Sequence, residues 1–201
     1  FSNEGRPDVD YVLTTVELAS MIESMGIELK ELEPEAFDMP LGFSTGGGVI
    51  FGTTGGVTEA VLRRLIEGHD PATLRAIAEC GARGDEGIKE FSVPYNGLDV
   101  KICVASGLAN ARKVLESVKS GEKEYHFIEV MACPGGCIGG GGRPEACFEQ
   151  KQLRNQGMFI ADEDCTLRSS EQNTALDGVY ILLRGRAHEL LHVHYPDHGH
   201  E

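Results

Sequence analysis

The sequence predicts an α/β fold, in which helices and strands form layers, followed by a helical C-terminal tail. Three observations support this prediction. Stretches with apolar residues at helical spacing alternate with stretches rich in β-branched and apolar residues. An Asn-Gly dipeptide at residues 96 and 97 separates two of the strand-like stretches. From Cys147 onward no stretch has a convincing strand pattern, which favours helices.

The N-terminal part of the chain predicts a helix followed by an irregular loop. Thr14 and Glu17 have the spacing of a capping box, which begins a helix. Apolar residues then recur at helical spacing until Gly26, which ends the helix. Residues 31–40 are rich in acidic residues and prolines, so we expect a loop there.

The middle of the chain predicts helices and strands in alternation. A glycine-rich stretch at residues 46–56 leads into a helix that begins at Thr58 and carries apolar residues on one face. The elements predicted after it are a hairpin of residues 91–93 and 100–105 around a Pro94–Gly97 turn, a helix near Leu108–Lys119 and a strand at His126–Val130.

Composition and charge bound the possible functions. A chain of 201 residues with 41% apolar residues can form one compact domain, or half of a larger one. Its 18 basic and 32 acidic residues give a net charge of −14, which argues against a nucleic-acid partner. No apolar run reaches the roughly 20 residues that span a bilayer. The chain begins at Phe1 without a leader pattern, and the early start of organised pattern favours a sequence that continues upstream. No leader therefore indicates the compartment, and the compartment that we expect is the cytoplasm.

The six cysteines are too few for a disulfide scaffold. Four of them are scattered singly and are interpreted as buried apolar groups or free thiols; they are Cys80, Cys103, Cys147 and Cys165. The other two, Cys133 and Cys137, follow a predicted strand and lie in a loop that is mostly glycine. Glycine lets backbone N–H groups approach a bulky inorganic group, and thiolates hold iron–sulfur clusters. The alternatives are a glycine-rich turn with inert cysteines, or a zinc site.

At these residues the sequence resembles the catalytic domain of [FeFe]-hydrogenases. One of that family's motifs reads E-x-M-A-C-x-x-G-C-x-x-G-G-G-x-P. The residues that match it are Glu129, Met131, Ala132, Cys133, Gly136, Cys137, Gly140, Gly141, Gly142 and Pro144. Three further stretches resemble other family segments, and they are Asp8–Leu18, Gly48–Val57 and Ala187–His192. The resemblance covers nearly the whole chain.

The resemblance implies one lobe of the hydrogenase catalytic domain, a short mixed or parallel sheet flanked by helices over about residues 5–145, with a helical tail over about 146–195. It also implies an H-cluster, in which a [4Fe-4S] cubane is bridged by a cysteine to a diiron unit with CO, cyanide and a dithiolate. By position, Cys133 would ligate the cubane, and Cys137 would ligate it and bridge to the diiron unit. The same carry-over assigns Gly136, Gly140 and Gly141 to cofactor binding, and Met131, Phe51 and Gly52 to the catalytic pocket.

The implied activity is reversible interconversion of dihydrogen with protons and electrons in an anaerobic hydrogen metabolism. The implied partners are the N-terminal half of the catalytic domain, ferredoxin or another redox carrier, and the hydrogenase maturation proteins. The family's first two cysteine motifs, which supply the other two cubane ligands, are absent from this sequence. We therefore expect this fragment to be inactive by itself. The chain also has Arg143 where the family usually has Gln, and Gly139 where Asn is common.

Two other functions are weighed against a hydrogenase. One is a non-catalytic relative, a hydrogenase-like sensor or iron–sulfur assembly protein that holds a cubane without the diiron unit. The other is a zinc peptidase, because residues 188–192 spell H-E-x-x-H, with His194, His198 or His200 as a third ligand. That motif lies so close to the last residue that no downstream helix can follow it within this sequence, and it coincides with the hydrogenase C-terminal pattern.

Overall fold

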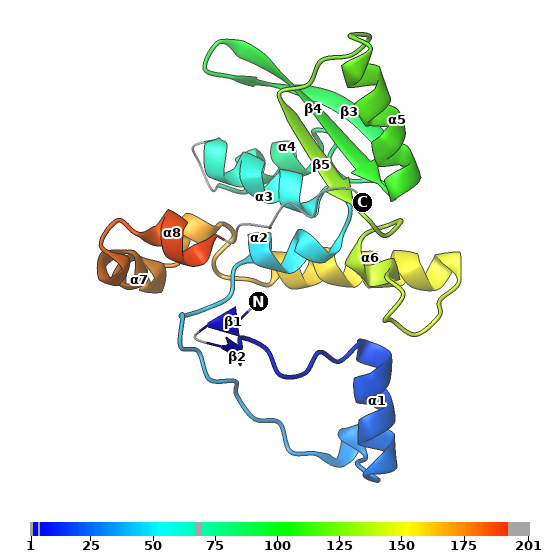
Figure 1. The fold of residues 1–201 in the computed structure, drawn as a ribbon, viewed down its shortest axis with the longest axis vertical. Coiled ribbons are helices and arrows are strands. Elements are labelled where there is room, and N and C mark those ends of the chain that lie inside the picture. The colour runs from blue at the N-terminus through cyan, green and yellow to red at the C-terminus, as the bar shows by residue number, and fades with distance from the viewer. Residues whose placement is uncertain (1, 4, 67–69, 193–201) are drawn as a thin grey trace.

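The computed structural model describes residues 2–3, 5–66 and 70–192 (Figure 1). Its helices are α1 (Thr15–Ser24), α2 (Gly46–Val49), α3 (Gly56–Leu65), α4 (Pro71–Ala78), α5 (Leu108–Lys119), α6 (Phe148–Glu163), α7 (Ala175–Leu183) and α8 (Ala187–Leu191). Its strands are β1 (Ser2–Asn3), β2 (Arg6–Pro7), β3 (Ile88–Tyr95), β4 (Leu98–Ser106) and β5 (Phe127–Met131). Short 3-10 turns occur at residues 29–31, 50–52, 137–139 and 170–172. Among the described residues no helix is both long and apolar enough to cross a membrane.

The main sheet is mixed and has the strand order β3-β4-β5. β3 and β4 are antiparallel, with Ile88 opposite Ala105 and Tyr95 opposite Leu98. A two-residue turn of Asn96 and Gly97 joins them, and both residues have positive φ, as a type I′ turn requires. β4 and β5 are parallel, and α5 makes the crossover between them. The predicted α/β class, with a short mixed sheet flanked by helices, is confirmed.

Helices cover both faces of the sheet (Figure 1). On one face, Leu62 of α3 and Ile77 of α4 pack against Val93 and Ile102. On the other face, Ala111 and Val114 of α5 pack against Cys103 and Ala105. Neighbouring residues of β4 thus point to opposite faces and enter different clusters, which fixes the register of this central strand.

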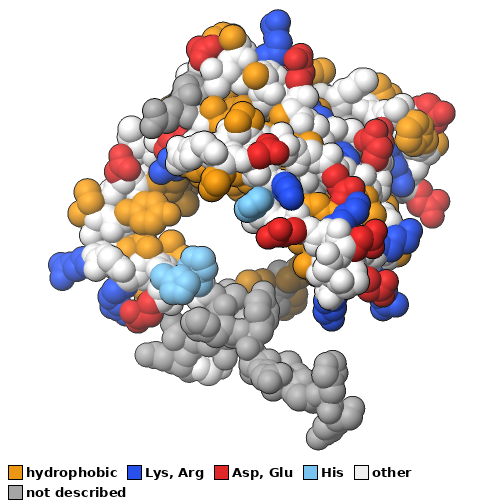
Figure 2. Space-filling model, turned by 90° about the horizontal axis from the view of Figure 1, so that it is seen from above, with side chains coloured by type: hydrophobic (Ala, Val, Ile, Leu, Met, Phe, Trp, Pro, Cys, Tyr) orange, Lys and Arg blue, Asp and Glu red, His pale blue; other side chains and the backbone are white. Residues whose placement is uncertain are grey.

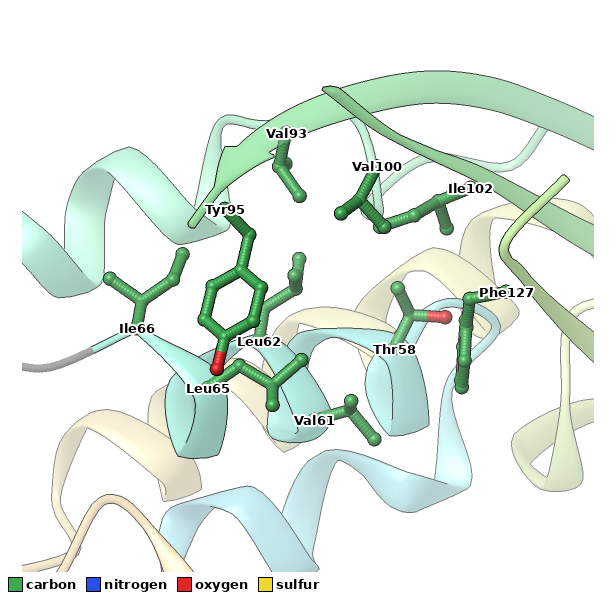
Figure 3. Close-up of a pocket in the computed structure, with 10 residues that line it drawn as sticks. All are labelled: Thr58, Val61, Leu62, Leu65, Ile66, Val93, Tyr95, Val100, Ile102 and Phe127. Carbon is green, nitrogen blue, oxygen red and sulfur yellow. The ribbon is translucent and has the colours of Figure 1, made fainter. Parts of the chain in front are cut away.

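A small apolar cavity of about 50 Å³ lies between α3 and the sheet (Figure 3). Leu62 and Leu65 of α3 face Val93 and Ile102 of the hairpin across it, and the Tyr95 ring stands at one side. A cavity of this size and composition is a packing gap that favours apolar over polar occupants. None of the residues that line it belongs to the loop that carries Cys133 and Cys137.

The C-terminal part is helical, as predicted, and it is joined to α3 by buried charges. α6 contacts α2, and its Asp162 forms an ion pair with Arg63 of α3. α7 and α8 lie beside each other, away from the main sheet. α1 projects from the end of the molecule that lies opposite the main sheet (Figure 1). In the space-filling view, apolar side chains are exposed around a broad opening (Figure 2).

Most predicted elements are present, with small differences in their ends. The capping box of Thr14 and Glu17 begins α1, and Gly26 has positive φ just after that helix ends. The second predicted helix begins at Gly56 rather than Thr58, because Gly55 supplies the left-handed conformation that redirects the chain. Two helices were not predicted. α4 begins at Pro71 behind the capping residue Asp70, and α2 is a single turn through three glycines.

Candidate metal centre

The loop that carries Cys133 and Cys137 begins where β5 ends. The end of β4 is hydrogen-bonded both to the last residue of β5 and to the loop. The Gly107 N–H, just after β4, donates to the carbonyl of Met131 at 2.7 Å. The Gly135 N–H donates to the hydroxyl of Ser106, the last residue of β4, at 2.8 Å. The ends of two parallel strands therefore fix the start of the loop. We call residues 132–142 the cysteine loop.

The two thiols of the cysteine loop are free and reach solvent. Cys133 is half-buried, Cys137 is exposed, and neither forms a disulfide. The Gly136 N–H donates to the carbonyl of Cys133 at 3.0 Å, and the Gly140 N–H donates to that of Cys137 at 3.2 Å. A Cβ added at Gly140 would lie 3.7 Å from the Cys133 sulfur. The sulfur thus lies over bare backbone, as the glycine content of the loop predicts.

Gly136 brings the cysteine loop into direct contact with the turn that contains Gly52. Its φ is +88°, and an added Cβ would lie 2.7 Å from the carbonyl oxygen of Gly52 and 3.0 Å from the backbone nitrogen of Thr54. No side chain fits between these two backbones. The structure therefore places the Gly52 backbone against the cysteine loop. We call residues 50–55 the glycine turn.

The other two predicted pocket residues have different surroundings. Met131 is half-buried at the end of β5, two residues before Cys133. Phe51 is 48% exposed and lines a hollow of about 280 Å³ with residues of α2 and α3. None of the residues that line this hollow belongs to the cysteine loop. The structure brings the Gly52 backbone to Gly136 of the cysteine loop, and the Phe51 ring lines this neighbouring hollow.

Sequence reasoning missed Glu129 as an organiser of this region. Its carboxylate accepts hydrogen bonds from the Gly55 N–H at 2.7 Å, the Thr58 N–H at 2.7 Å and the Thr58 hydroxyl at 2.6 Å. The backbone N–H groups at the start of α3 are the kind of donors that bind an anion. The structure shows that the anion bound there is the protein's own carboxylate.

A basic hollow of about 540 Å³ lies beside the cysteine loop. It is lined by Gly139–Gly141 and by the basic residues Arg143, Lys151 and Arg154, among others. Arg154 donates to the carbonyls of Ile138 and Pro144 at 3.1 and 3.0 Å, and so holds the end of the loop from α6. Basic side chains therefore gather at the Gly139–Gly141 end of the cysteine loop.

Two observations test whether these residues fit an iron–sulfur group. Two free thiols, of which that of Cys133 lies over bare backbone, are the donors that such a group takes. The backbone of Thr54 lies against Gly136, and the Thr54 hydroxyl is buried without a hydrogen-bond partner. Among the described residues no group of three cysteine, histidine or acidic side chains could hold a metal. The residues therefore fit as two ligands of a larger set.

The H-E-x-x-H motif lies on α8 and the residue that follows it. The rings of His188 and His192 are 4.5 Å apart, and Glu189 pairs with Arg186 at 2.7 Å. The glutamate of the motif is thus held by an arginine. The candidate third ligands His194, His198 and His200 lie outside the described residues.

Comparison with known families finds two matches. Residues 1–141 match the family described as "Iron only hydrogenase large subunit, C-terminal domain". Residues 148–198 match the family described as "Iron hydrogenase small subunit".

Individual relatives agree with these family matches. The chain is 44% identical over 202 residues to "NADP-reducing hydrogenase subunit HndD" of Solidesulfovibrio fructosivorans, which covers 97% of this chain and 34% of the relative. It is 32% identical over 149 residues to "Cytosolic iron-sulfur assembly component 3" of Rattus norvegicus, covering 69% of this chain and 30% of that protein. The chain thus spans about a third of the length of these relatives.

A similar fold occurs in a solved structure of a variant of [FeFe]-hydrogenase HydA1 from Chlamydomonas reinhardtii. The two have a TM-score of 0.66 and 33% sequence identity. The superposition covers 95% of this chain and 56% of the other. At this identity and coverage, the likeness extends from the sheet to the helical tail.

Proposed function

This chain belongs to the iron-only hydrogenase large-subunit family, and from that membership we propose that it is part of an [FeFe]-hydrogenase catalytic subunit. The observation that carries the proposal is the pair of free thiols, Cys133 and Cys137, in the glycine-rich loop that follows β5. The reaction would be the reversible interconversion of dihydrogen with two protons and two electrons.

The cysteine loop would hold the H-cluster through its thiolates. When bound, the cluster supplies the redox chemistry that exchanges dihydrogen for protons and electrons. Cys133 and Cys137 would provide two thiolates, and the second would also bridge to the diiron unit. Gly136, Gly140 and Gly141 would keep side chains out of the space that the cluster needs.

Other residues of this chain would shape the pocket and tune its electrostatics. The Gly52 backbone lies against the cysteine loop, and Met131 lies two residues before Cys133, so both are suited to line the pocket and exclude water. Phe51 would complete that lining from the same turn. The basic hollow beside the loop would stabilise negative charge on the thiolates.

The remaining ligands and partners would come from other protein segments. Two thiolates leave half of the cubane unligated, so the N-terminal half of the catalytic domain would supply the rest. Maturation proteins would build the diiron unit, and ferredoxin or a similar carrier in the cytoplasm would exchange the electrons. The similarity of residues 148–198 to the hydrogenase small subunit suggests that the helical tail contributes to that assembly.

A second candidate function is a non-catalytic iron–sulfur protein. The observation that favours it is the similarity to a cytosolic iron–sulfur assembly component over 69% of this chain. Such a protein would use Cys133 and Cys137 for a cubane alone. Arg143 and Gly139, which depart from the usual hydrogenase pattern, line the hollow at which the two functions would differ.

One experiment separates the two candidates. The complete catalytic domain that contains this sequence is produced with and without the maturation proteins, and iron content, infrared spectra and hydrogen turnover are measured. A hydrogenase shows CO and cyanide stretching bands and turnover after maturation. A cubane with no such bands supports the non-catalytic function.

Matched variants locate the site within the chain. Cys133→Ser and Cys137→Ser are expected to lose bound iron, whereas Cys165→Ser keeps it, because the Cys165 thiol instead donates to the carbonyl of Ala161. Full iron binding in both of the first two variants would refute the proposed site.

A further inference from the structure

We propose that Glu129 is a positioning residue, which locks the glycine turn to the strand that carries the cysteines. The inference rests on the proposed function, because positioning matters only if the cysteine loop and the glycine turn form one site. Glu129 lies on β5, two residues before Met131 and four before Cys133. Its side chain is 6% exposed, so solvent cannot replace its hydrogen bonds.

The carboxylate of Glu129 stabilises the beginning of α3. It accepts three hydrogen bonds from Gly55 and Thr58, at 2.6–2.7 Å. Those two N–H groups belong to the first turn of the helix or to the residue before it, where the chain leaves N–H groups unpaired and the helix dipole favours negative charge. Because β5 supplies the carboxylate, helix and strand are joined at this point.

A buried lysine binds the same turn through a backbone carbonyl, whereas Glu129 binds it through N–H groups. Lys89 of β3 is 6% exposed, and its ammonium group donates to the carbonyls of Thr54 at 3.1 Å and Gly84 at 2.9 Å. Burial lowers the pKa of Lys89, and the negative charge of Glu129 opposes that shift. In the Thr54–Gly55 peptide, the carbonyl therefore accepts a hydrogen bond from the Lys89 cation, and the N–H donates one to the Glu129 anion.

The glycine turn is thereby fixed at two separate points, one on β5 and one in the cysteine loop that follows β5. One point is the Glu129 carboxylate, and the other is the close contact of Gly136 with the Gly52 carbonyl and the Thr54 nitrogen. Gly55 and Gly56 are packed too closely against other backbone to carry a side chain. An added Cβ at Gly55 would lie 1.9 Å from the Ala82 carbonyl oxygen, and one at Gly56 would lie 1.8 Å from the Ile50 carbonyl oxygen. Loss of the carboxylate leaves the turn attached to the cysteine strand at one point only.

The test uses Glu129→Gln and Thr58→Val in the complete, matured catalytic domain. Gln keeps the shape but places an amide N–H₂ among donors, and Val removes one of the three hydrogen bonds without changing the volume. We expect the CO and cyanide bands to shift and broaden, more in Glu129→Gln than in Thr58→Val. The amide hydrogens of Gly55 and Thr58 should exchange faster. A misplaced turn should lower kcat about 10- to 100-fold, with an unchanged KM for the electron carrier.

Glu90→Gln on β3 is the matched control, because Glu90 is an exposed carboxylate of the same sheet that pairs with Lys123. It should leave the bands and kcat unchanged. Wild-type bands in Glu129→Gln overturn the proposal, even if that variant melts at a lower temperature. If Glu129→Gln does not fold, wild-type bands in Thr58→Val overturn it instead. If the wild type itself shows no CO or cyanide bands, the proposed catalysis fails, and the paramagnetic spectrum of the reduced cubane in the same variants decides the positioning role.

Discussion

Arg63 carries its charge into the interior between α3 and α6. Its guanidinium donates to both carboxylate oxygens of Asp162 at 2.6 and 2.7 Å and to Glu59 at 2.6 Å. Arg83 and Arg168 approach the same carboxylates from the half-buried edge. Breaking a buried pair costs much more than the pair contributes, because the remaining charge is left without a partner.

Asp162→Asn should therefore strongly destabilise the protein. We expect the free energy of unfolding to fall by about 3–5 kcal/mol, since the buried Arg63 loses the charge of its two-bond partner and keeps only that of Glu59. Chemical denaturation measures this change. Glu189→Gln, which removes the exposed pair with Arg186, is the control and should unfold like the wild type. A loss of stability of similar size in both variants would contradict the prediction.

The same network predicts how stability depends on pH. Burial by itself raises the pKa of Asp162, but hydrogen bonds and charges from Arg63 and Arg168 outweigh it and hold the pKa below its ordinary value. A carboxylate with a lowered folded pKa contributes stability that is complete above the unfolded value of about 3.9 and is lost as the pH falls through the folded value. Urea denaturation of the wild type should show this loss below about pH 4. The free energy of unfolding should fall less steeply with pH for Asp162→Asn than for the wild type. Equal slopes would show that Asp162 does not cause the loss.

At the scale of elements, the cysteine loop depends on a glycine that touches another backbone. Gly136→Ala combines an unfavourable positive φ with a clash against the Gly52 carbonyl. Gly121→Ala is the control, because Gly121 has φ +75° but open space around it. We expect the free energy of unfolding to fall by at least about 1 kcal/mol more in Gly136→Ala than in Gly121→Ala, as measured by thermal or urea denaturation. Both variants carry the strain of positive φ, and the difference is the cost of overpacking. Equal losses would show that the clash is relieved by movement.

The far end of the cysteine loop depends on α6. Arg154 donates to the carbonyl of Ile138 in the loop and to that of Pro144 just after it, and a lysine cannot bind both as a fork. Arg154→Lys should speed amide exchange at Gly139 and Gly140 by about tenfold, which corresponds to one lost charge-assisted hydrogen bond of roughly 1.5 kcal/mol. Arg112→Lys on α5 should leave exchange in the loop unchanged. Equally slow exchange in both variants would show that the conformation of the loop does not depend on Arg154.

Local patterns in the sequence were sufficient to predict the elements that have their own signals. The Asn-Gly turn predicted the hairpin, and the capping box of Thr14 and Glu17 predicted the start of α1. The helix over Leu108–Lys119 was predicted with its observed ends. α2 could not be predicted, because three successive glycines disfavour a helix and its stability comes from contacts with α3 and α6.

The candidate site was predictable only in part, for a similar reason. The cysteines and glycines of the loop share one short stretch, so their pattern can be recognised. Glu129 binds residues 71 and 74 positions away, and nothing in the local sequence identifies its partners. The buried network of Arg63 and Asp162 is likewise joined across 99 positions. Side chains whose role depends on such distant pairing are visible only in the fold.

At the scale of the whole molecule, a large apolar surface is exposed. The segment from Val9 to Phe43 carries many exposed apolar side chains, of which Phe37 is 90% and Val12 is 84% exposed. Surfaces of this kind mark contacts with other protein segments. This agrees with a chain that spans about a third of the length of its relatives.

A hydrophobic dye tests that surface. We expect the chain alone to bind anilinonaphthalene sulfonate, and Val12→Ser with Phe37→Ser to reduce the fluorescence without changing the melting temperature. Val104→Ser is the contrasting variant, since Val104 is fully buried and should lower the melting temperature instead. Undiminished fluorescence in the double variant would assign dye binding to another surface.

The two ends of β4 differ in what they tolerate. Its first residue follows the exposed Asn96–Gly97 turn, whereas its last residue, Ser106, holds the cysteine loop. Eight residue steps separate these ends by about 26 Å. A fluorescent label, affinity tag or surface tether inserted at the turn would therefore leave the opposite end of the sheet undisturbed. The hairpin tip is thus the natural handle by which this protein can be immobilised or tracked.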